Sequence, residues 1–253
     1  MRQNTNQLGP FPMKSKPVRT IFSALLGQLP MVLFVILIGW SGIAFGQDSL
    51  KLDTFSKTLK PGKLPEGWEA KKFAPVMGSG KDYHFQFVHD SADKHYLHVR
   101  SGANNSFSVG AVKEIQLTDW PVLAWDWKIT QTPKGGDVRQ KKKDDQAGAM
   151  CIVIAPSTFG FDSILCYIFE NDGPKETVLT STKEPTAKYL ILRTAKTDKT
   201  GEWYQERRNV LADYKKAFGK TPNKAGVIGV QIDSNDTESS GEAFYKNIEL
   251  FKK

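Results

Sequence analysis

The chain has 253 residues, a formal net charge of +8, 40% hydrophobic residues and 25% charged residues. Its densest basic cluster, in residues 134–143, contains no aromatic residue and is followed directly by Asp144 and Asp145. A nucleic-acid-binding surface combines clustered basic residues with aromatic residues, so the composition argues against a nucleic-acid partner and indicates a solvated loop instead.

Residues 14–47 have the pattern of a secretory signal. Basic residues precede a long apolar run, and Ala44 and Gly46 occupy the −3 and −1 positions of a cleavage site before Gln47. Cleavage there removes four basic residues and no acid, which lowers the formal charge from +8 to +4. We therefore expect residues 1–46 to be a signal peptide and residues 47–253 to form a single periplasmic or secreted domain.

The same apolar run can instead remain as a membrane anchor. Residues 21–40 are long enough for one transmembrane helix, although Gln28 and Pro30 interrupt them. In that alternative the domain is tethered by this segment, which is its only expected contact with the membrane. No cysteine precedes Cys151, which excludes a lipid-modified cysteine after the leader.

Most of the remaining chain consists of short strand-like runs separated by Gly, Pro, Asn, Asp and Ser. These runs lie at residues 68–73, 83–89, 95–100, 106–112, 122–130, 147–155, 163–169, 177–181, 189–193, 227–233 and 244–251. Without regular alternation of strands and helices, they predict a mostly β fold: an antiparallel two-sheet β-sandwich resembling a jelly roll. In the last run we expect Phe244, Ile248 and either Leu250 or Phe251 to face the interior.

All four histidines fall within two neighbouring strand-like runs. They are His84, His89, His95 and His98. Within each run the two histidines have opposite parity, so neither strand presents both on one face. Zinc sites also need a ligand spacing that is absent here, and we expect all four side chains to face solvent.

The densest group of candidate binding residues lies at residues 125–145. On a strand, Trp125 and Trp127 project from one face because side chains alternate. Two neighbouring tryptophans form either a core layer or a platform for a sugar ring or another apolar ligand. Candidates for ligand binding are, in chain order, Trp127, Asp137, Arg139, Asp145, Trp203 and Arg207.

Cys151 and Cys166 lie on two apolar runs with a turn-like segment between them. An antiparallel hairpin that turns near residues 157–160 places the two cysteines opposite one another, within reach of a disulfide. Export would permit oxidation. Two buried free thiols that pack as small apolar groups fit the pattern equally well.

One short amphipathic helix is predicted at residues 209–218. Val210, Tyr214 and Phe218 recur at four-residue spacing and form one apolar face. Asn209 is a typical residue for the helix N-cap, and Gly219 is typical of the position that ends a helix.

Glu206 belongs to a charged group just before this helix. A glycoside hydrolase needs two carboxyl groups about 5–10 Å apart, one of them with a raised pKa. In this hypothesis Glu206 pairs with Asp126, Asp137 or Asp145. Charged residues beside a helix are otherwise caps and surface ion pairs, and both interpretations fit the spacing.

An oxygen-rich loop occupies residues 233–238. Asp233, Asn235 and Asp236 supply the kinds of oxygen ligand that calcium prefers. The loop lacks the glycine and the distant glutamate of a calcium-binding loop, so a turn that hydrogen-bonds to itself is the better interpretation. We therefore expect neither a metal ion nor a cofactor.

Several of these motifs together resemble the bacterial family called domain of unknown function 3047. The similarity spans most of residues 52–251 and departs from the family pattern at residues 146–150, which lack an arginine, and at Phe169, where the family often has tryptophan. The motifs are Trp125–Lys128, the Gly-Gly-Asp-x-Arg of residues 135–139, Asp145, Trp203, Arg208, Asn209, residues 213–219 and the loop at 233–236. The resemblance implies a bacterial exported single domain and assigns no catalytic residue.

These observations favour an exported binding module of the cell envelope that recognises carbohydrate or another envelope ligand, with no assignable catalytic activity. The grounds are the leader, the β-sandwich pattern, the six tryptophans and the absence of catalytic spacing. Two alternatives stay open. One is a glycan-directed hydrolase that uses the carboxyl pair described above. The other is a structural or assembly protein that docks a partner through its edge strands and basic loop.

Overall fold

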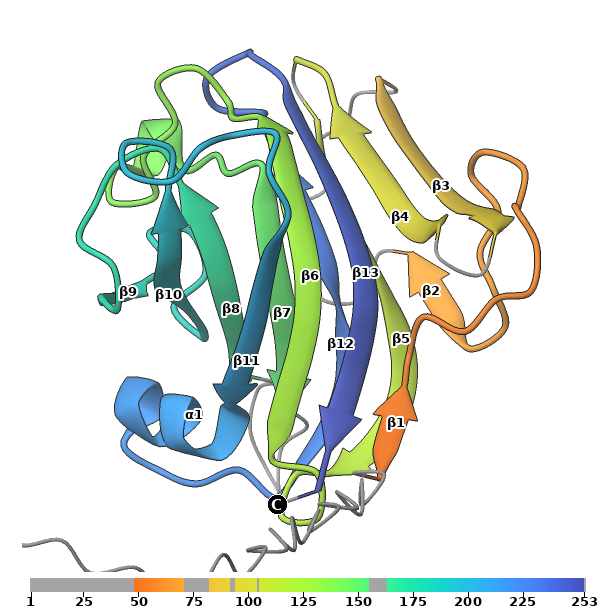
Figure 1. Ribbon diagram of the computed structural model, residues 1–253. Coiled ribbons are helices and arrows are strands. Elements are labelled where there is room, and N and C mark those ends of the chain that lie inside the picture. The colour runs from red at the N-terminus through yellow and green to blue at the C-terminus, as the bar shows by residue number, and fades with distance from the viewer. Residues whose placement is uncertain (1–47, 71–81, 92–93, 104, 155–162, 253) are drawn as a thin grey trace, which may run out of the picture. The chain divides into compact units, whose positions relative to one another are not determined.

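The computed structural model describes residues 48–70, 82–91, 94–103, 105–154 and 163–252 (Figure 1). The expected signal peptide at residues 1–46, including the alternative anchor at residues 21–40, lies outside these described residues. Among the residues that are described, no helix is both long and apolar enough to cross a membrane. All of them belong to one compact unit of the chain, Phe45–Lys253.

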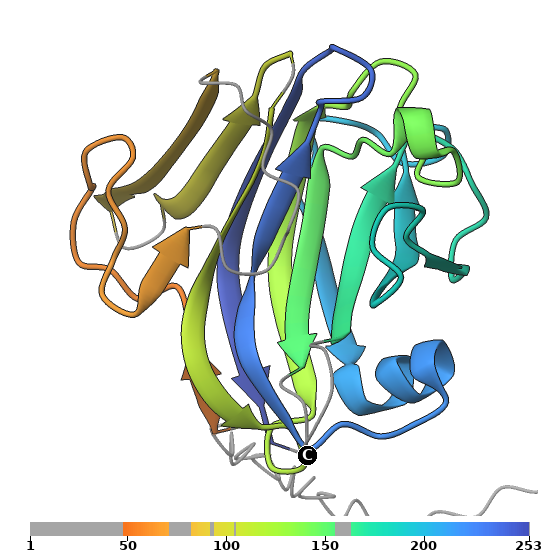
Figure 2. The same cartoon turned by 180° about the vertical axis from the view of Figure 1, so that it is seen from behind.

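Two β-sheets pack face to face, which confirms the predicted sandwich (Figures 1 and 2). Sheet A contains β1 (Ser49–Lys51), β3 (Tyr83–Ser91), β4 (Lys94–Ser101), β6 (Val122–Gln131), β11 (Tyr204–Asn209) and β13 (Gly241–Phe251). Sheet B contains β2 (Trp68–Ala70), β5 (Ser106–Gln116), β7 (Gly148–Ile154), β8 (Ser163–Glu170), β9 (Val178–Thr180), β10 (Ala187–Thr194) and β12 (Lys224–Asp233). A short 3-10 helix, η1 (Lys141–Lys143), and one α-helix, α1 (Val210–Phe218), complete the described elements.

Strands from the end of the chain occupy the centre of both sheets. In sheet B, β12 lies between β5 and β7, and in sheet A, β13 lies between β6 and β4. This crossing of distant strands is what makes the sandwich resemble a jelly roll. Among the described strand pairs, β8 with β10 is parallel and the others are antiparallel, so sheet B is mixed where the sequence predicted antiparallel pairing.

Large aromatic residues fill the space between the sheets. Trp125 and Trp127 of β6 are at most 1% exposed, and the ring of Trp125 stacks on Tyr167 of β8 with the centroids 5.2 Å apart. The ring of Trp127 meets Phe169 edge-on at 5.9 Å. The two tryptophans therefore form a core layer, one of the two interpretations that the sequence left open.

Cys151 of β7 and Cys166 of β8 lie directly opposite one another and form a disulfide with their Cα atoms 4.1 Å apart. Both belong to a second apolar cluster, whereas their neighbours Met150 and Ile152 belong to the core between the sheets. Because side chains alternate along a strand, the disulfide lies on the face of sheet B that points away from sheet A.

Helix α1 begins and ends where the sequence predicted. The Asn209 Oδ1 atom accepts a hydrogen bond from the Ala212 backbone N–H at 3.0 Å, which caps the first turn. Gly219 adopts the left-handed conformation with φ 72°, and its N–H donates to the Lys215 carbonyl at 2.9 Å. The helix thus receives a side-chain cap at one end and a glycine at the other.

Strand β13 contains a bulge that changes which residues face the core. Its register shifts between Lys246 and Glu249, and Asn247 has φ 53°. The residues facing inward are Ala243 and Tyr245 before the bulge and Ile248 and Leu250 after it. The prediction was therefore right for Ile248 and Leu250 and wrong for Phe244, which lies on the opposite, outer face.

Candidate binding face on sheet A

Alternation along β6 gives sheet A two chemically different faces. Trp127 and its same-face neighbours point into the sandwich, whereas Asp126 and Lys128 point outward. Figure 1 shows this outer face toward the viewer, with no described element crossing in front of β6, β13 or β4. On this face Lys128 is partly exposed, whereas Asp126 is buried with 7% exposure.

One line of outward side chains crosses the strands of sheet A. Trp203 directly precedes β11, and because Tyr204 pairs with Trp127, Trp203 lies beside Lys128. Lys128 is opposite Phe244 of β13, and Phe244 is opposite His98 of β4. We call Trp203, Lys128, Phe244 and His98 the transverse row. Neighbouring strands lie about 4.8 Å apart, so the row extends across four strand positions of the sheet.

The members of the transverse row contact one another. The Lys128 Nζ atom lies 5.2 Å from the Trp203 ring centroid and 4.4 Å from that of Phe244. The rings of Phe244 and His98 are stacked, with centroids 4.4 Å apart and planes inclined by 2°. Lys246, also on β13, places its Nζ atom 4.5 Å from the Trp203 centroid. Trp203 remains 37% exposed, so its ring presents apolar surface to solvent.

Polar groups border the transverse row on β6 and β13. The Glu242 carboxylate is 2.9 Å from the His98 Nε2 atom and accepts a hydrogen bond from the Thr130 hydroxyl at 2.6 Å. Burial raises the pKa of Glu242, but the hydrogen bonds from Thr130 and His98 outweigh burial and leave the pKa below its ordinary value. The row therefore ends beside an ionised hydrogen-bond acceptor.

The structure distributes the six predicted ligand-binding residues over separate places. Trp203 is exposed at one end of the transverse row, and Arg207 projects from β11 with its guanidinium 4.2 Å from the Phe251 ring centroid. Trp127 is fully buried, and its indole N–H donates to Glu206 at 3.1 Å. The other three, Asp137, Arg139 and Asp145, belong to the segment between β6 and β7.

The four candidate catalytic carboxylates are held in different surroundings. Glu206 faces inward and accepts hydrogen bonds from Trp127 and Arg193, whereas Asp126 faces outward and accepts one from Asn247 at 2.7 Å. These two carboxylates thus project from opposite faces of sheet A.

The remaining two candidates are bound within loops. Asp137 binds the Arg139 guanidinium, which lowers the pKa of Asp137 to about 2 and makes it unsuited to act as a general acid. Asp145 is fully buried and accepts hydrogen bonds from the backbone N–H groups of Asp236 and Thr237 and from the Thr237 hydroxyl. Neither side chain is free to pair with Glu206.

The oxygen-rich loop between β12 and β13 is organised around a lysine. The Lys183 ammonium binds the Asp236 carboxylate and the side-chain oxygen of Asn235. Asp233 is buried, and burial raises the pKa of its carboxyl group. Within the described residues, no group of three His, Cys, Asp or Glu side chains is arranged to hold a metal ion. The lysine lies among the oxygens that would otherwise surround a cation.

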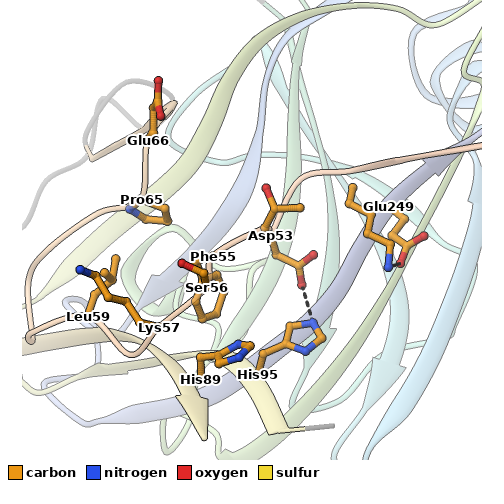
Figure 3. Close-up of a pocket in the computed structure, with 12 residues that line it drawn as sticks. Asp53, Phe55, Ser56, Lys57, Leu59, Pro65, Glu66, His89, His95 and Glu249 are labelled. Atoms are coloured by element: carbon orange, nitrogen blue, oxygen red, sulfur yellow. Dashed lines mark ion pairs between the residues drawn. The ribbon is translucent and has the colours of Figure 1, made fainter. Parts of the chain in front are cut away.

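Two of the histidines line a pocket of about 770 Å³ at the edge of sheet A (Figure 3). His89 of β3 and His95 of β4 are directly opposite one another and share the face of the buried residues Phe87 and Leu97. The prediction that all four histidines face solvent was therefore wrong for this pair, because both project into the pocket under the segment that follows β1.

Asp53 lies within this pocket and is only 6% exposed. Among the described residues its Oδ2 atom has no hydrogen-bond partner, and it is 3.7 Å from the His95 Nε2 atom. Burial raises the pKa of Asp53, although a backbone hydrogen bond from Ile248 and the nearby His95 partly oppose that effect. The Nδ1 atom of His89 is also buried without a partner. The pocket thus offers a carboxyl group and two imidazoles to a small polar molecule.

The chain matches one known protein family. Residues 66–249 match the model of the family described as "Protein of unknown function (DUF3047)", which confirms the resemblance found in the sequence. The chain belongs to the DUF3047 family. No curated protein matches it.

Solved structures resemble this DUF3047 protein only distantly. The family 11 carbohydrate-binding module of the cellulosomal cellulase Lic26A-Cel5E of Clostridium thermocellum has a TM-score of 0.42 and 11% identity, over 78% of this chain and 94% of that one. The xyloglucanase domain of NopAA, a type three effector from Sinorhizobium fredii solved with cellobiose, has a TM-score of 0.42 and 12% identity, over 82% and 96%. Similarities this weak do not indicate a function.

Sequence reasoning on this DUF3047 protein missed most of the transverse row. It named Trp203, but it treated Phe244 as a core residue and His98 as an isolated solvent-facing residue. Parity placed Lys128 on the face opposite the two tryptophans, but it did not connect Lys128 with the other members of the row. The order of strands in the sheet, which joins these residues into one line, has no local signal in the sequence.

Proposed function

We propose that this protein is an exported, non-catalytic binding module of the bacterial cell envelope, and that the outer face of sheet A binds carbohydrate. The transverse row carries the proposal, because it combines an exposed tryptophan with a second aromatic ring on a sheet face that none of the described elements covers. The flat apolar face of an aromatic ring accepts the C–H face of a sugar. Trp203 offers such a face, whereas Phe244 is stacked on His98 and adds apolar contact beside it.

Hydrogen-bonding groups beside the rings support a polar ligand. Glu242 is ionised and half-buried, and its carboxylate already accepts from Thr130 and approaches His98. Such fixed acceptors and donors orient the hydroxyl groups of a sugar while the rings supply contact area. This pairing of a stacking surface with fixed polar groups favours a saccharide over a purely apolar ligand.

Export is supported by two independent features. The leader at residues 14–47 has the composition and ending of a secretory signal. The Cys151–Cys166 disulfide is of the kind that forms and persists in oxidising compartments such as the periplasm. Together they favour a periplasmic or secreted domain over a cytoplasmic one.

The hydrolase alternative has less support. Glycoside hydrolysis needs two carboxyl groups that flank one bond, and one of them must hold a proton. Glu206 and Asp126 lie on opposite faces of sheet A, and Asp137 has a pKa of about 2. Binding without catalysis is therefore the function that this geometry favours.

Isothermal titration calorimetry on the protein produced from its full sequence tests the proposal. After a glycan array has identified a bound oligosaccharide, Trp203→Ala should weaken its binding at least tenfold, equivalent to about 1.4 kcal/mol, because the exposed stacking surface is lost. The thermal unfolding midpoint should change little, because Trp203 is not part of the core.

Trp120→Ala is the matched control, since Trp120 is a partly buried tryptophan outside the transverse row. It should leave saccharide affinity unchanged in a protein that remains folded. If no saccharide binds, the carbohydrate part of the proposal is wrong, and an envelope protein becomes the expected ligand of this face. If the two tryptophan variants lose affinity equally, the binding site does not lie on the transverse row.

A further inference from the structure

Two lysines border the exposed tryptophan, and neither pairs with an acid. The Nζ atoms of Lys128 and Lys246 lie 5.2 Å and 4.5 Å from the Trp203 ring centroid. Within the described residues, neither ammonium forms an ion pair with a carboxylate. Asp126, the acid opposite Lys246 in the ladder, accepts a hydrogen bond from Asn247 instead. The ammonium donors of both lysines are therefore available to a ligand.

The acids beside the row are already engaged. Glu242 keeps its charge but binds Thr130 and His98, and within the described residues it forms no direct ion pair with Lys128. Cation–π contacts with the rings hold the ammonium groups close to the surface but do not cancel their charge. This part of the face thus combines apolar rings with two ammonium groups that have no direct ion-pair partner among the described residues.

The position of Lys128 brings its ammonium group close to a sugar bound on this face. Lys128 lies between Trp203 and Phe244 in the transverse row, so a saccharide that covers both rings passes directly over its Nζ atom. A neutral sugar would cover that ammonium group with hydroxyls alone, which costs part of its hydration. A carboxylate at the same place forms charge-assisted hydrogen bonds, which are the stronger kind.

We infer that the ligand is an acidic polysaccharide whose carboxylates bind Lys128 and Lys246 while one of its sugar rings stacks on Trp203. This inference rests on the proposed function, since it specifies the class of carbohydrate taken by the same face. The positive formal charge of the chain is in accord with it, because attraction at long range speeds the encounter with a polyanion.

Matched saccharide pairs test the inference. Oligogalacturonate, oligoalginate and hyaluronan oligosaccharides are each titrated by calorimetry in the acidic form and after methyl esterification, which removes the charge but keeps the backbone. At least one acidic form should bind ten or more times more tightly than its ester. Raising the salt concentration should weaken the acidic form and leave the ester nearly unaffected.

Variants then test whether Lys128 and Lys246 cause the preference for the acidic form. The double variant Lys128→Gln and Lys246→Gln should lose the preference for the acidic form and bind acid and ester within threefold of one another. Trp203→Ala should weaken both forms. Lys113→Gln, which changes an exposed lysine of β5 in the other sheet, should leave the preference intact. Thermal unfolding of every variant checks that the fold is retained.

Each contrary outcome has one meaning. Equal affinity for acid and ester overturns the anionic ligand and leaves the carbohydrate-binding face standing. Binding of neither form, nor of any saccharide on the array, overturns the proposed function. Equal affinity for polyglutamate and the acidic saccharide would show that charge alone causes the attraction. If the double lysine variant keeps its preference for the acidic form, other residues bind the carboxylates. Both results overturn the inference.

Discussion

Asp144 and Asp145 are neighbours in the chain and both are buried, yet their carboxylates have opposite surroundings. Asp145 accepts three hydrogen bonds through its two oxygens. Within the described part of the chain, Asp144 accepts one, from the Thr182 hydroxyl at 3.1 Å, and its Oδ1 atom has no partner. Burial raises the pKa of Asp144 to about 6, despite the opposing effects of Lys183 and Thr182. Hydrogen bonds from the protein thus replace water at both oxygens of Asp145 but at only one oxygen of Asp144.

Asp144→Asn should therefore stabilise the protein above pH 6. Because the folded-state pKa lies above the ordinary 3.8, the contribution of Asp144 to stability is full below pH 3.8 and is lost as the pH rises through about 6. The loss amounts to at most about 3 kcal/mol, and asparagine keeps an acceptor for Thr182 without carrying charge. Urea unfolding at pH 7.5 should show a gain of about 1–3 kcal/mol for the variant, and unfolding at pH 4 almost none.

Asp145→Asn is the control, and its effect should have the opposite sign. Asparagine offers one acceptor oxygen where three donors converge, so the variant should lose about 1–3 kcal/mol at pH 7.5. If both variants were stabilised alike, relief of general charge repulsion would explain the gain, and the missing hydrogen bond of Asp144 would not.

Residues of β6 show what parity can and cannot predict. Alternation correctly placed Trp125 and Trp127 on one face of a strand. Which face meets the other sheet depends on partners far away in the chain, and both tryptophans turned out to be in the core. Trp203 is exposed because it lies at the edge of sheet A, and an edge position has no local signal.

At the scale of elements, β11 escaped prediction for a physical reason. Its inward residues include Glu206 and Arg208, which are satisfied by Arg193 and by Asp213 respectively. A strand whose inner face is polar and ion-paired lacks the alternation of apolar and polar residues that marks strands in sequence. Helix α1 has its apolar spacing and both end signals within eleven residues, and it was predicted correctly.

The bulge in β13 is maintained by a residue in the left-handed region. Asn247 has φ 53°, and its side-chain amide donates to Asp126 at 2.7 Å. Asn247→Val should lower the free energy of unfolding by about 2–3 kcal/mol, because a β-branched residue is strained at positive φ and the hydrogen bond is lost. Asn247→Gly also loses the hydrogen bond but relieves the backbone, so it should remain within about 1 kcal/mol of the parent.

Chemical denaturation of the two variants separates these causes. Equal losses for valine and glycine would assign the whole effect to the Asp126 hydrogen bond and would contradict a backbone requirement at position 247. A large loss for valine alone would confirm that the conformation of Asn247 sets the register, and thereby the outward position of Phe244.

At the scale of the whole molecule, the sandwich was predictable and its strand order was not. Short alternating runs indicated two antiparallel sheets. The partners of β12 and β13 lie far earlier in the chain, and the hydrophobic pattern of a strand does not identify its neighbour. The parallel pairing of β8 with β10 was missed for the same reason.

The Cys151–Cys166 disulfide should stabilise the whole domain without being needed to form it. It closes a loop with a sequence separation of 15 residues, for which the loss of chain entropy predicts about 3 kcal/mol. The double variant Cys151→Ala and Cys166→Ala should unfold at a lower urea concentration and keep the circular dichroism spectrum of the parent, because the core between the sheets contains neither cysteine.

Reductant provides the control for this prediction. Dithiothreitol should lower the stability of the parent to that of the double variant and leave the variant unaffected. A parent protein whose unfolding does not respond to reductant would contradict a stabilising role for the disulfide.

The central place of β13 also constrains how the molecule is made. This strand ends at Phe251, yet it lies between β6 and β4 and also pairs with β1. Synthesis delivers residues in order, so β6 and β4 lack their shared neighbour until Gly241–Phe251 has left the ribosome. Sheet A therefore cannot assemble completely before β13 has been synthesised.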